Sequence, residues 1–111
     1  MKLTALADAV VPEGKVVGYL LSPTHQAGRG KAAFFCRFGF AAEKWQELAA
    51  ALLRHAAEQD VKITEESRFG TKYVIEGVLN TPDGRNPTVR VVWFLGRKQT
   101  APRLVTAYGC E

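Results

Sequence analysis

The segment Thr88-Val89-Arg90-Val91-Val92-Trp93-Phe94-Leu95 has the composition of a β-strand, because β-branched and aromatic residues fill most of it. Successive side chains of a strand point to opposite faces. Four apolar residues then share the face that we expect to pack on a core: Val89, Val91, Trp93 and Leu95. The opposite face is mixed and carries Thr88, Arg90, Val92 and Phe94. This is the strongest strand signal in the chain, and it predicts a sheet with one buried face.

Three further segments alternate in the same way, at 61–65, 72–79 and 103–108. Gly70 predicts the turn between the first two strands. The stretch 80–87, with Pro82-Asp83-Gly84 at its centre, predicts the next turn. A polar, basic connection from Gly96 to Pro102 precedes the last strand. Four strands with short connections predict an antiparallel meander.

Upstream of Val61 the apolar residues follow a helical period. Pro12-Glu13 is typical of a helix start, and Ser22-Pro23 ends that helix. A second helix is expected from about Gly30 to Arg37, with Gly39 as its left-handed cap. The longest helix is expected from about Ala42 to Gln59.

The longest predicted helix gathers its apolar residues on one face, at Trp45, Leu48, Ala49, Leu52 and Ala56. His55 lies beside this face, and we expect a partly buried or surface position for it.

Residues 1–11 predict a short edge strand or a first pass across the core. The predicted fold class is α+β, with two to three N-terminal helices packed on one face of a four-stranded antiparallel meander sheet, in a single domain over residues 1–111.

The composition of the chain narrows its function without deciding it. The 111 residues are 47% hydrophobic and 23% charged, which suits one compact domain. A net charge of +4 favours an acidic or nucleic-acid partner. Neither an apolar run of signal-peptide length nor a membrane-spanning segment is present, so we expect a cytoplasmic protein that does not contact membranes.

The cysteines and histidines are few and widely spaced. Cys36 and Cys110 suit a reduced intracellular protein, and the aromatic neighbours of Cys36 predict a small core residue there. No close Cys/His spacing occurs, so we expect neither a metal site nor a cofactor. The Gly30-Lys31 pair is not a P-loop, because that motif needs Gly where this chain has His25 and Ser or Thr where it has Ala32.

The loop His25-Gln26-Ala27-Gly28-Arg29-Gly30-Lys31 leads directly into a predicted helix. His25, Arg29 and Lys31 add positive charge beside the positive end of the helix dipole, which predicts an anion or RNA-binding site. An ordinary solvated loop, whose glycines only make a tight turn, explains the same residues. Both interpretations stay open at this point.

The face of the predicted sheet that points away from the core carries polar residues from all four strands. In the last strand Val105 and Ala107 are expected in the core, which leaves Leu104 outside. The polar set is Lys62, Lys72, Glu76, Arg90, Thr106 and Tyr108. Arg90 and a lysine suit a phosphodiester, and Glu76 or Tyr108 suits removal of the proton from a ribose 2′-OH. The alternative is a solvated face with cross-strand charge pairs.

The order of motifs along almost the whole chain resembles an uncharacterised family of short bacterial proteins, the domain of unknown function 6883. The matching segments are Tyr19-Leu20-Leu21-Ser22-Pro23-Thr24-His25, Gly30-Lys31-Ala32-Ala33-Phe34-Phe35, Phe38-Gly39-Phe40, Phe69-Gly70-Thr71-Lys72-Tyr73-Val74-Ile75-Glu76-Gly77, Pro82-Asp83-Gly84, Val89-Arg90-Val91-Val92-Trp93 and Pro102-Arg103-Leu104-Val105-Thr106-Ala107-Tyr108. Members are often encoded beside another short protein, which implies a toxin–antitoxin-like pair.

Helices followed by a four-stranded sheet also resemble the barnase–EndoU–colicin–RelE group of ribonuclease toxins in architecture. That resemblance implies catalytic residues on the sheet face, at the positions Lys72, Arg90, Thr106 and Tyr108, with His25 and Lys31 from the helical side. No predicted strand carries a histidine, which departs from the histidine-using members.

Two hypotheses follow for the function. The first is a toxin-type ribonuclease that needs no metal and acts on RNA by 2′-OH attack. The second is a non-enzymatic binding module, either the antitoxin or an accessory protein of such a pair. In both hypotheses the expected partner is a small protein encoded nearby. Under the first hypothesis the protein also binds RNA, as its substrate.

Overall fold

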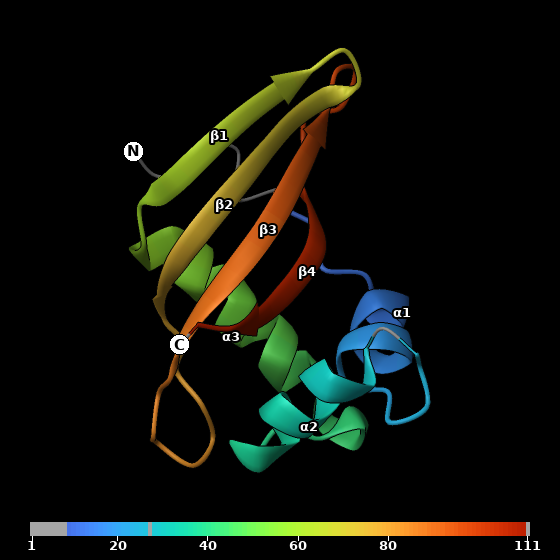
Figure 1. The fold of residues 1–111 in the computed structure, drawn as a ribbon, viewed down its shortest axis with the longest axis vertical. Helices are drawn as coiled ribbons and strands as arrows, with labels where there is room; N and C mark the ends of the chain where they lie inside the picture. Colours follow the sequence, from blue (N-terminus) through green and yellow to red (C-terminus); the bar gives the residue numbers. More distant parts are fainter. Residues whose placement is uncertain (1–8, 27, 111) are drawn as a thin grey trace.

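The computed structural model describes residues 9–26 and 28–110 of the chain. Within these residues every helical element precedes the strands (Figure 1). The helical part consists of α1 (Glu13–Lys15), the π-helical turn η2 (Val16–Leu20), α2 (Arg29–Arg37), the 3-10 turn η3 (Ala42–Lys44) and α3 (Trp45–Glu58). The strands are β1 (Val61–Ser67), β2 (Gly70–Val78), β3 (Thr88–Gly96) and β4 (Arg103–Gly109).

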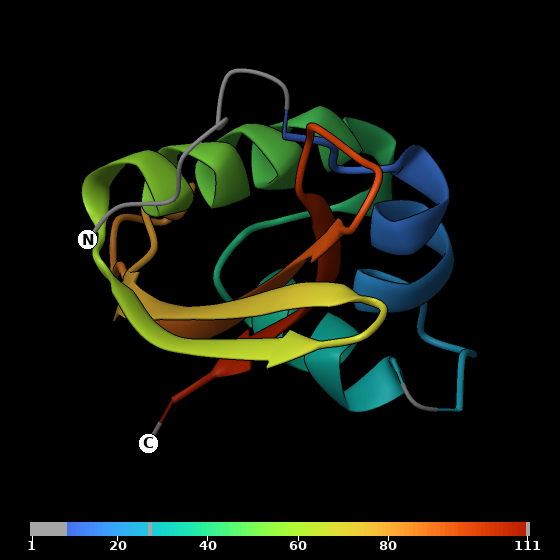
Figure 2. The same ribbon diagram turned by 90° about the horizontal axis from the view of Figure 1, so that it is seen from above.

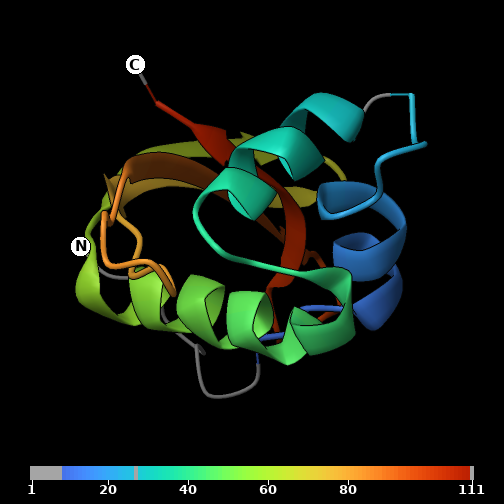
Figure 3. The same ribbon diagram turned by 90° about the horizontal axis from the view of Figure 1, so that it is seen from below.

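The strands form one antiparallel sheet in the order β1-β2-β3-β4, so the meander and the α+β class are confirmed. Helix α3 lies across one face of the sheet (Figure 2). Helix α2 lies next to the edge strand β4 (Figure 3). Of the predicted N-terminal segment, residues 1–8 lie outside the described residues, and Val10 forms an isolated parallel bridge to Arg103.

The core fills the space between α3 and the sheet. Leu48 and Leu52 of α3 are fully buried, as are Ile75, Val91 and Trp93 of the strands. The apolar residues of α3 recur at three- and four-residue spacing, which turns one stripe of the helix towards the sheet. The predicted core faces of α3 and β3 are therefore largely confirmed.

A β-bulge in β4 changes which residues of that strand reach the core. Val92 pairs with Thr106, but the next residue, Trp93, pairs with Leu104, so Val105 is the extra residue. Leu104 is buried, whereas the side chain of Val105 is exposed. The prediction that Val105 is in the core and Leu104 outside it was therefore wrong, because simple alternation does not allow for an inserted residue.

Two single-residue expectations also need correction. Cys36 is exposed rather than buried, because its neighbour Phe35 occupies the side of α2 that faces the core. His55 is not at the surface: only 1% of it is accessible, and its Nε2 lies 3.2 Å from the carbonyl oxygen of Gly77. A histidine in the interior of the helix–sheet layer makes folding sensitive to pH.

We predict that acidification through the ordinary pKa of histidine destabilises the fold. Burial lowers the pKa of His55 below its ordinary value of 6.5, and the hydrogen bond to Gly77 only partly opposes this shift. The unfolded chain then binds the proton more readily, so stability is greatest above about pH 6.5 and falls at lower pH. Urea unfolding between pH 8 and pH 5 measures this loss. The same series on His55→Leu should show a shallower slope, and equal slopes would contradict the account.

Candidate functional site

The sheet face opposite α3, which we call the outer face, carries polar residues in a row across three strands. Glu76 of β2 pairs with Arg90 of β3, and Arg90 pairs with Tyr108 of β4. Lys62 of β1 reaches the same row through its ammonium group, whose Nζ lies 2.6 Å from Oε1 of Glu76. Side chains opposite one another on neighbouring strands are within contact range. Three predicted site residues are therefore neighbours.

Glu76 is held as a carboxylate by two cations. Besides the contact with Lys62, its Oε2 accepts a hydrogen bond from Nε of Arg90 at 2.5 Å. The hydrogen bonds from Lys62 and Arg90 lower the pKa of Glu76. The hydrogen bond to Glu76 raises the pKa of Arg90, and the hydrogen bond to Tyr108 adds a smaller effect in the same direction. Glu76 therefore accepts a proton poorly, and its clearest role is to position the Arg90 guanidinium.

Tyr19 of η2 meets the outer face beside this row. Its hydroxyl lies 3.0 Å from Oγ1 of Thr106, whose strand partner is Val92. Partial burial opposes ionisation, but hydrogen bonds to Thr106 and Lys31 and the charges of Lys31 and Lys15 outweigh it and lower the pKa of Tyr19. A phenol whose ionised form is stabilised by two lysines is suited to proton transfer.

Lys31 of α2 connects Tyr19 with the polar row. Its Nζ lies 5.5 Å from the centre of the Tyr19 ring and 5.9 Å from the centre of the Tyr108 ring. Both distances are within the range of cation–π attraction, which contributes about 0.5–1 kcal/mol at exposed sites. An ammonium group between two phenols is placed to bind an anion that contacts both of them.

The loop before α2 orients the ring of His25. The rings of His25 and Tyr19 are 5.0 Å apart at 77°, in an edge-to-face arrangement. Nδ1 of His25 accepts the N–H of Gly28 at 3.0 Å, and the carbonyl oxygen of His25 accepts the N–H of Arg29 at 2.8 Å. These two N–H groups bond within the loop and do not converge on a ligand. Neutral imidazole that accepts at Nδ1 carries its proton on Nε2 and acts there as a donor.

Two of the predicted site residues lie away from this group. Lys72 forms an ion pair with Glu65 at 2.6 Å, and it is four residues from Glu76, or about 13 Å along the strand. Arg29 lines a different groove, with Leu21 and Cys36 among its neighbours. The predicted residues that do come together are Glu76, Arg90, Thr106, Tyr108, His25 and Lys31, joined by Tyr19. We call Tyr19, Lys31, Arg90, Thr106 and Tyr108 the outer-face cluster.

Tyr19 is the member of the cluster that the sequence did not reveal. In a helical segment its ring counts as apolar, and its hydroxyl partner is 87 residues away. The one local signal is Lys15, four residues earlier, whose Nζ lies 5.2 Å from the centre of the Tyr19 ring. A lysine at this spacing lies on the same side of a helical segment, but such pairs are also common on ordinary surfaces.

A cavity of about 400 Å³ lies between α2 and the end of β4, directly beside the cluster. Lys31 and Tyr108 belong both to the cluster and to the cavity wall. Phe34, Arg37 and Cys110 also line the cavity. The cluster is therefore bordered by a hollow that combines aromatic and basic side chains.

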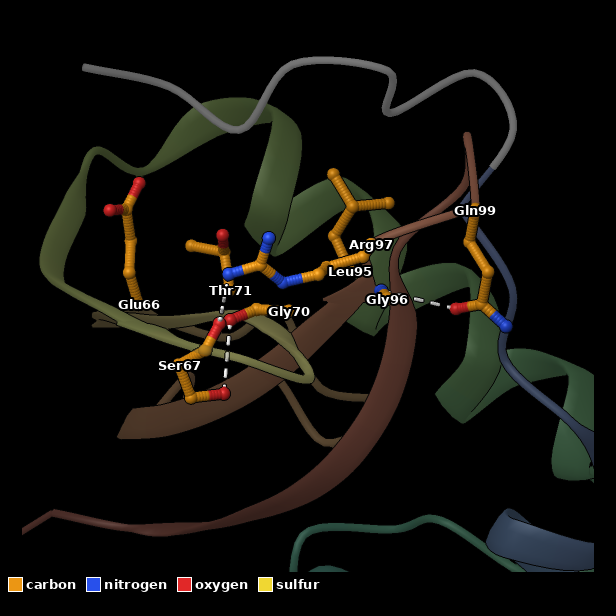
Figure 4. A pocket seen from close by; sticks show the side chains of 8 residues that line it. All are labelled: Glu66, Ser67, Gly70, Thr71, Leu95, Gly96, Arg97 and Gln99. Atoms are coloured by element: carbon orange, nitrogen blue, oxygen red, sulfur yellow. Dashed lines mark hydrogen bonds between the residues drawn. The ribbon is translucent and has the colours of Figure 1, made fainter.

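A second cavity, of about 370 Å³, lies at the far end of the sheet, at the turns between strands (Figure 4). Its polar groups serve those turns. Ser67 donates its hydroxyl to the Gly70 carbonyl at 3.2 Å, and Gln99 accepts the Gly96 N–H at 3.1 Å. Arg97 donates to the Ser67 carbonyl at 3.3 Å. We assign no reaction to this cavity.

Among residues 9–26 and 28–110, no three or more His, Cys, Asp or Glu side chains gather as a set of metal ligands. Within the same ranges, no helix has both the length and the apolar character needed to cross a membrane.

The structure is that of an α+β protein whose outer-face cluster is a candidate site of basic and phenolic side chains. The chain belongs to the DUF6883 family, a domain of unknown function, whose family model matches residues 2–111. No curated protein matches the chain.

Among solved structures, the chain is similar to a chain of a contact-dependent growth inhibition toxin–immunity protein complex from Klebsiella pneumoniae 342. The match has a TM-score of 0.73 and 16% sequence identity, and it covers 98% of this chain and 99% of that chain. At this identity the comparison demonstrates a shared fold.

We predict that Tyr19 ionises at lower pH than an ordinary tyrosine, because Lys31 and Thr106 stabilise its phenolate. Ultraviolet titration of the wild type and of Tyr19→Phe gives the Tyr19 contribution by difference. In Lys31→Met the same difference should move to higher pH, since one positive charge and one donor are lost. A Tyr19 titration at the ordinary value near 10, unchanged by Lys31→Met, would contradict this assignment.

Proposed function

We propose that this protein is a toxin-type ribonuclease whose reaction takes place at the outer-face cluster. The observation that carries the proposal is the meeting of Tyr19, Lys31, Thr106 and Tyr108, which come from the helical part and from β4. The net charge of +4 suits an RNA substrate. The shared fold with a chain of a toxin–immunity protein complex supports a role as one member of such a pair, either the toxin or the immunity protein.

The proposed reaction is attack of a ribose 2′-oxygen on the adjacent phosphorus. The 2′-O–P bond forms, the P–O5′ bond breaks, and the products are a 2′,3′-cyclic phosphate and a free 5′-hydroxyl. One group must remove the 2′-OH proton and another must protonate the leaving 5′-oxygen. The two proton transfers together with stabilisation of the charged phosphorane define the roles that the cluster has to supply.

The cluster offers one residue for each role. The Tyr19 phenolate, favoured by its lowered pKa, removes the 2′-OH proton. Tyr108 accepts from the Arg90 guanidinium, which leaves its phenolic hydrogen for the 5′-oxygen. Lys31, between the two rings, binds the non-bridging phosphate oxygens.

The second hypothesis is a non-enzymatic module that binds a partner protein. The specific observation in its favour is the charge chain Lys62–Glu76–Arg90, in which both cations are paired with Glu76, as is common for cross-strand pairs on an ordinary sheet face. Under this hypothesis the chain forms a stable complex with a small protein encoded nearby, and it leaves RNA intact.

We predict that the purified protein cleaves single-stranded RNA to products with 2′,3′-cyclic phosphate ends. Tyr19→Phe should lower the cleavage rate by about 10²- to 10⁴-fold, the usual contribution of a general acid–base group. Lys31→Met should lower it by about 10²- to 10³-fold, the usual cost of removing one group that stabilises the charge of the transition state. Lys98→Met is the matched control, because Lys98 is an exposed lysine in the β3–β4 connection. This variant should cleave RNA at the rate of the wild type. Exposed substitutions usually change stability by less than about 0.5 kcal/mol, so the thermal melt of Lys98→Met should stay close to that of the wild type.

Expression in a bacterial host separates the two hypotheses. A ribonuclease toxin should arrest growth, and Tyr19→Phe or Tyr108→Phe should relieve the arrest at equal protein level. Normal growth at high expression, with intact cellular RNA and a stable complex with the neighbouring gene product, would favour the binding module and overturn the proposed reaction.

A further inference from the structure

The cavity between α2 and β4 is built from two sides. Lys31, Phe34 and Arg37 are spaced by three along α2, so they follow one side of the helix. Tyr108, Gly109 and Cys110 form the opposite wall at the end of β4. Phe34 lies so close to this strand that a Cβ at Gly109 would overlap its ring. The helix is thus held against the strand by an aromatic ring that is also part of the cavity wall.

The wall combines aromatic surface with positive charge. Phe34 and Tyr108 supply aromatic surface, and Lys31 and Arg37 are separated by nearly two turns of α2. None of the seven lining residues is acidic. Aromatic platforms flanked by cations are the arrangement with which proteins bind single-stranded nucleic acid, by stacking on bases and by attracting phosphates.

We propose that this cavity binds an unpaired nucleobase next to the phosphate that is cleaved, so that the substrate is single-stranded RNA. This inference rests on the proposed function, because Lys31 and Tyr108 belong both to the cavity and to the outer-face cluster. A base stacks against Phe34, its 3′ or 5′ phosphate lies on Lys31, and the next phosphate lies towards Arg37. The volume of about 400 Å³ is within the usual range of about 300–1,000 Å³ for small-ligand pockets.

A base can enter this cavity only when it is not paired. In a helical duplex the base faces are stacked on one another and are not available to a protein aromatic ring. The cavity thus selects loops, bulges and single strands over duplex RNA. This preference is separate from the chemistry of the cluster, which acts on a phosphodiester of any sequence.

The test uses a fluorescent 2′-fluoro RNA octamer, which lacks the attacking hydroxyl and reports binding alone by anisotropy. Phe34→Leu should weaken binding by roughly fivefold to a hundredfold, the range measured for loss of one base stack. Arg37→Gln should weaken it less and should reduce its dependence on salt. Phe69→Leu is the matched control, because Phe69 is an aromatic residue with 67% exposure at the β1–β2 turn. It should bind like the wild type.

Changes in the ligand complete the test, and those measured on the wild type do not depend on the folding of Phe34→Leu. A single abasic position scanned along the octamer should weaken binding to the wild type at one site. In Phe34→Leu the same abasic change should cost no further affinity. The matching duplex should bind at least tenfold more weakly than the single strand.

Any one of three results would overturn the inference. The first is that Phe34→Leu and Arg37→Gln both bind the octamer like the wild type. The second is equal affinity for duplex and single strand, and the third is an abasic scan in which no position lowers the affinity of the wild type. Cleavage of the unmodified octamer is measured in parallel. Selective binding without cleavage would support the base site and overturn the proposed reaction. Cleavage that Phe34→Leu leaves unchanged, with unchanged binding, would overturn the base site alone.

Discussion

The hydrogen bond between the Tyr19 hydroxyl and Thr106 joins the two halves of this protein, across 87 residues of sequence. It attaches the helical segment to the edge strand β4 on the outer face of the sheet. The turn η2, which carries Tyr19, is π-helical, and the N–H of Leu21 bonds to the carbonyl of Val16. Such wide turns often occur at functional sites. This contact places the phenol of Tyr19 beside Thr106, where Lys31 lies within cation–π range of both Tyr19 and Tyr108.

The electrostatics of the outer face divide the charged groups into two kinds. Glu76 is paired with Lys62 and Arg90, and those pairs fix the guanidinium in place. Lys15 and Lys31 instead act on a phenol and lower its pKa. Exposed ion pairs contribute little stability, with a median of about 0–1 kcal/mol. We therefore infer that the pairs of Glu76 serve chiefly to orient the Arg90 guanidinium. In the proposed reaction, the proton transfers and the phosphate contact take place at Tyr19, Lys31 and Tyr108.

Much of the architecture could be predicted from the sequence, because period-two and helical patterns report directly on burial. The four strands, the outer-face positions in β2 and β3 and the left-handed cap at Gly39, with φ of 103°, all follow from local rules. The bulge at Val105 could not be predicted, since it depends on pairing with β3. Alternation assigns Lys72 and Glu76 to the same face, but it does not show that Lys72 pairs with Glu65 at a distance from the cluster.

Only part of the candidate site could be predicted from the sequence. Alternation gives the face of each strand residue, whereas the contribution of Tyr19 depends on where a helix meets an edge strand. The loop from His25 to Lys31 stood out through its charges and glycines. Its structural role is to present His25 and Lys31 to Tyr19, while the N–H groups of Gly28 and Arg29 bond within the loop.

The most direct test of the central claim, that the outer face beside β4 binds RNA, is a map of amide chemical shifts during titration with an uncleavable single strand. The account predicts saturable shifts at Tyr19, Lys31, Thr106 and Tyr108, with small shifts in the turn at Ser67–Gly70. Shifts concentrated at that turn or along β1, with the residues around Tyr19 unchanged, would contradict it.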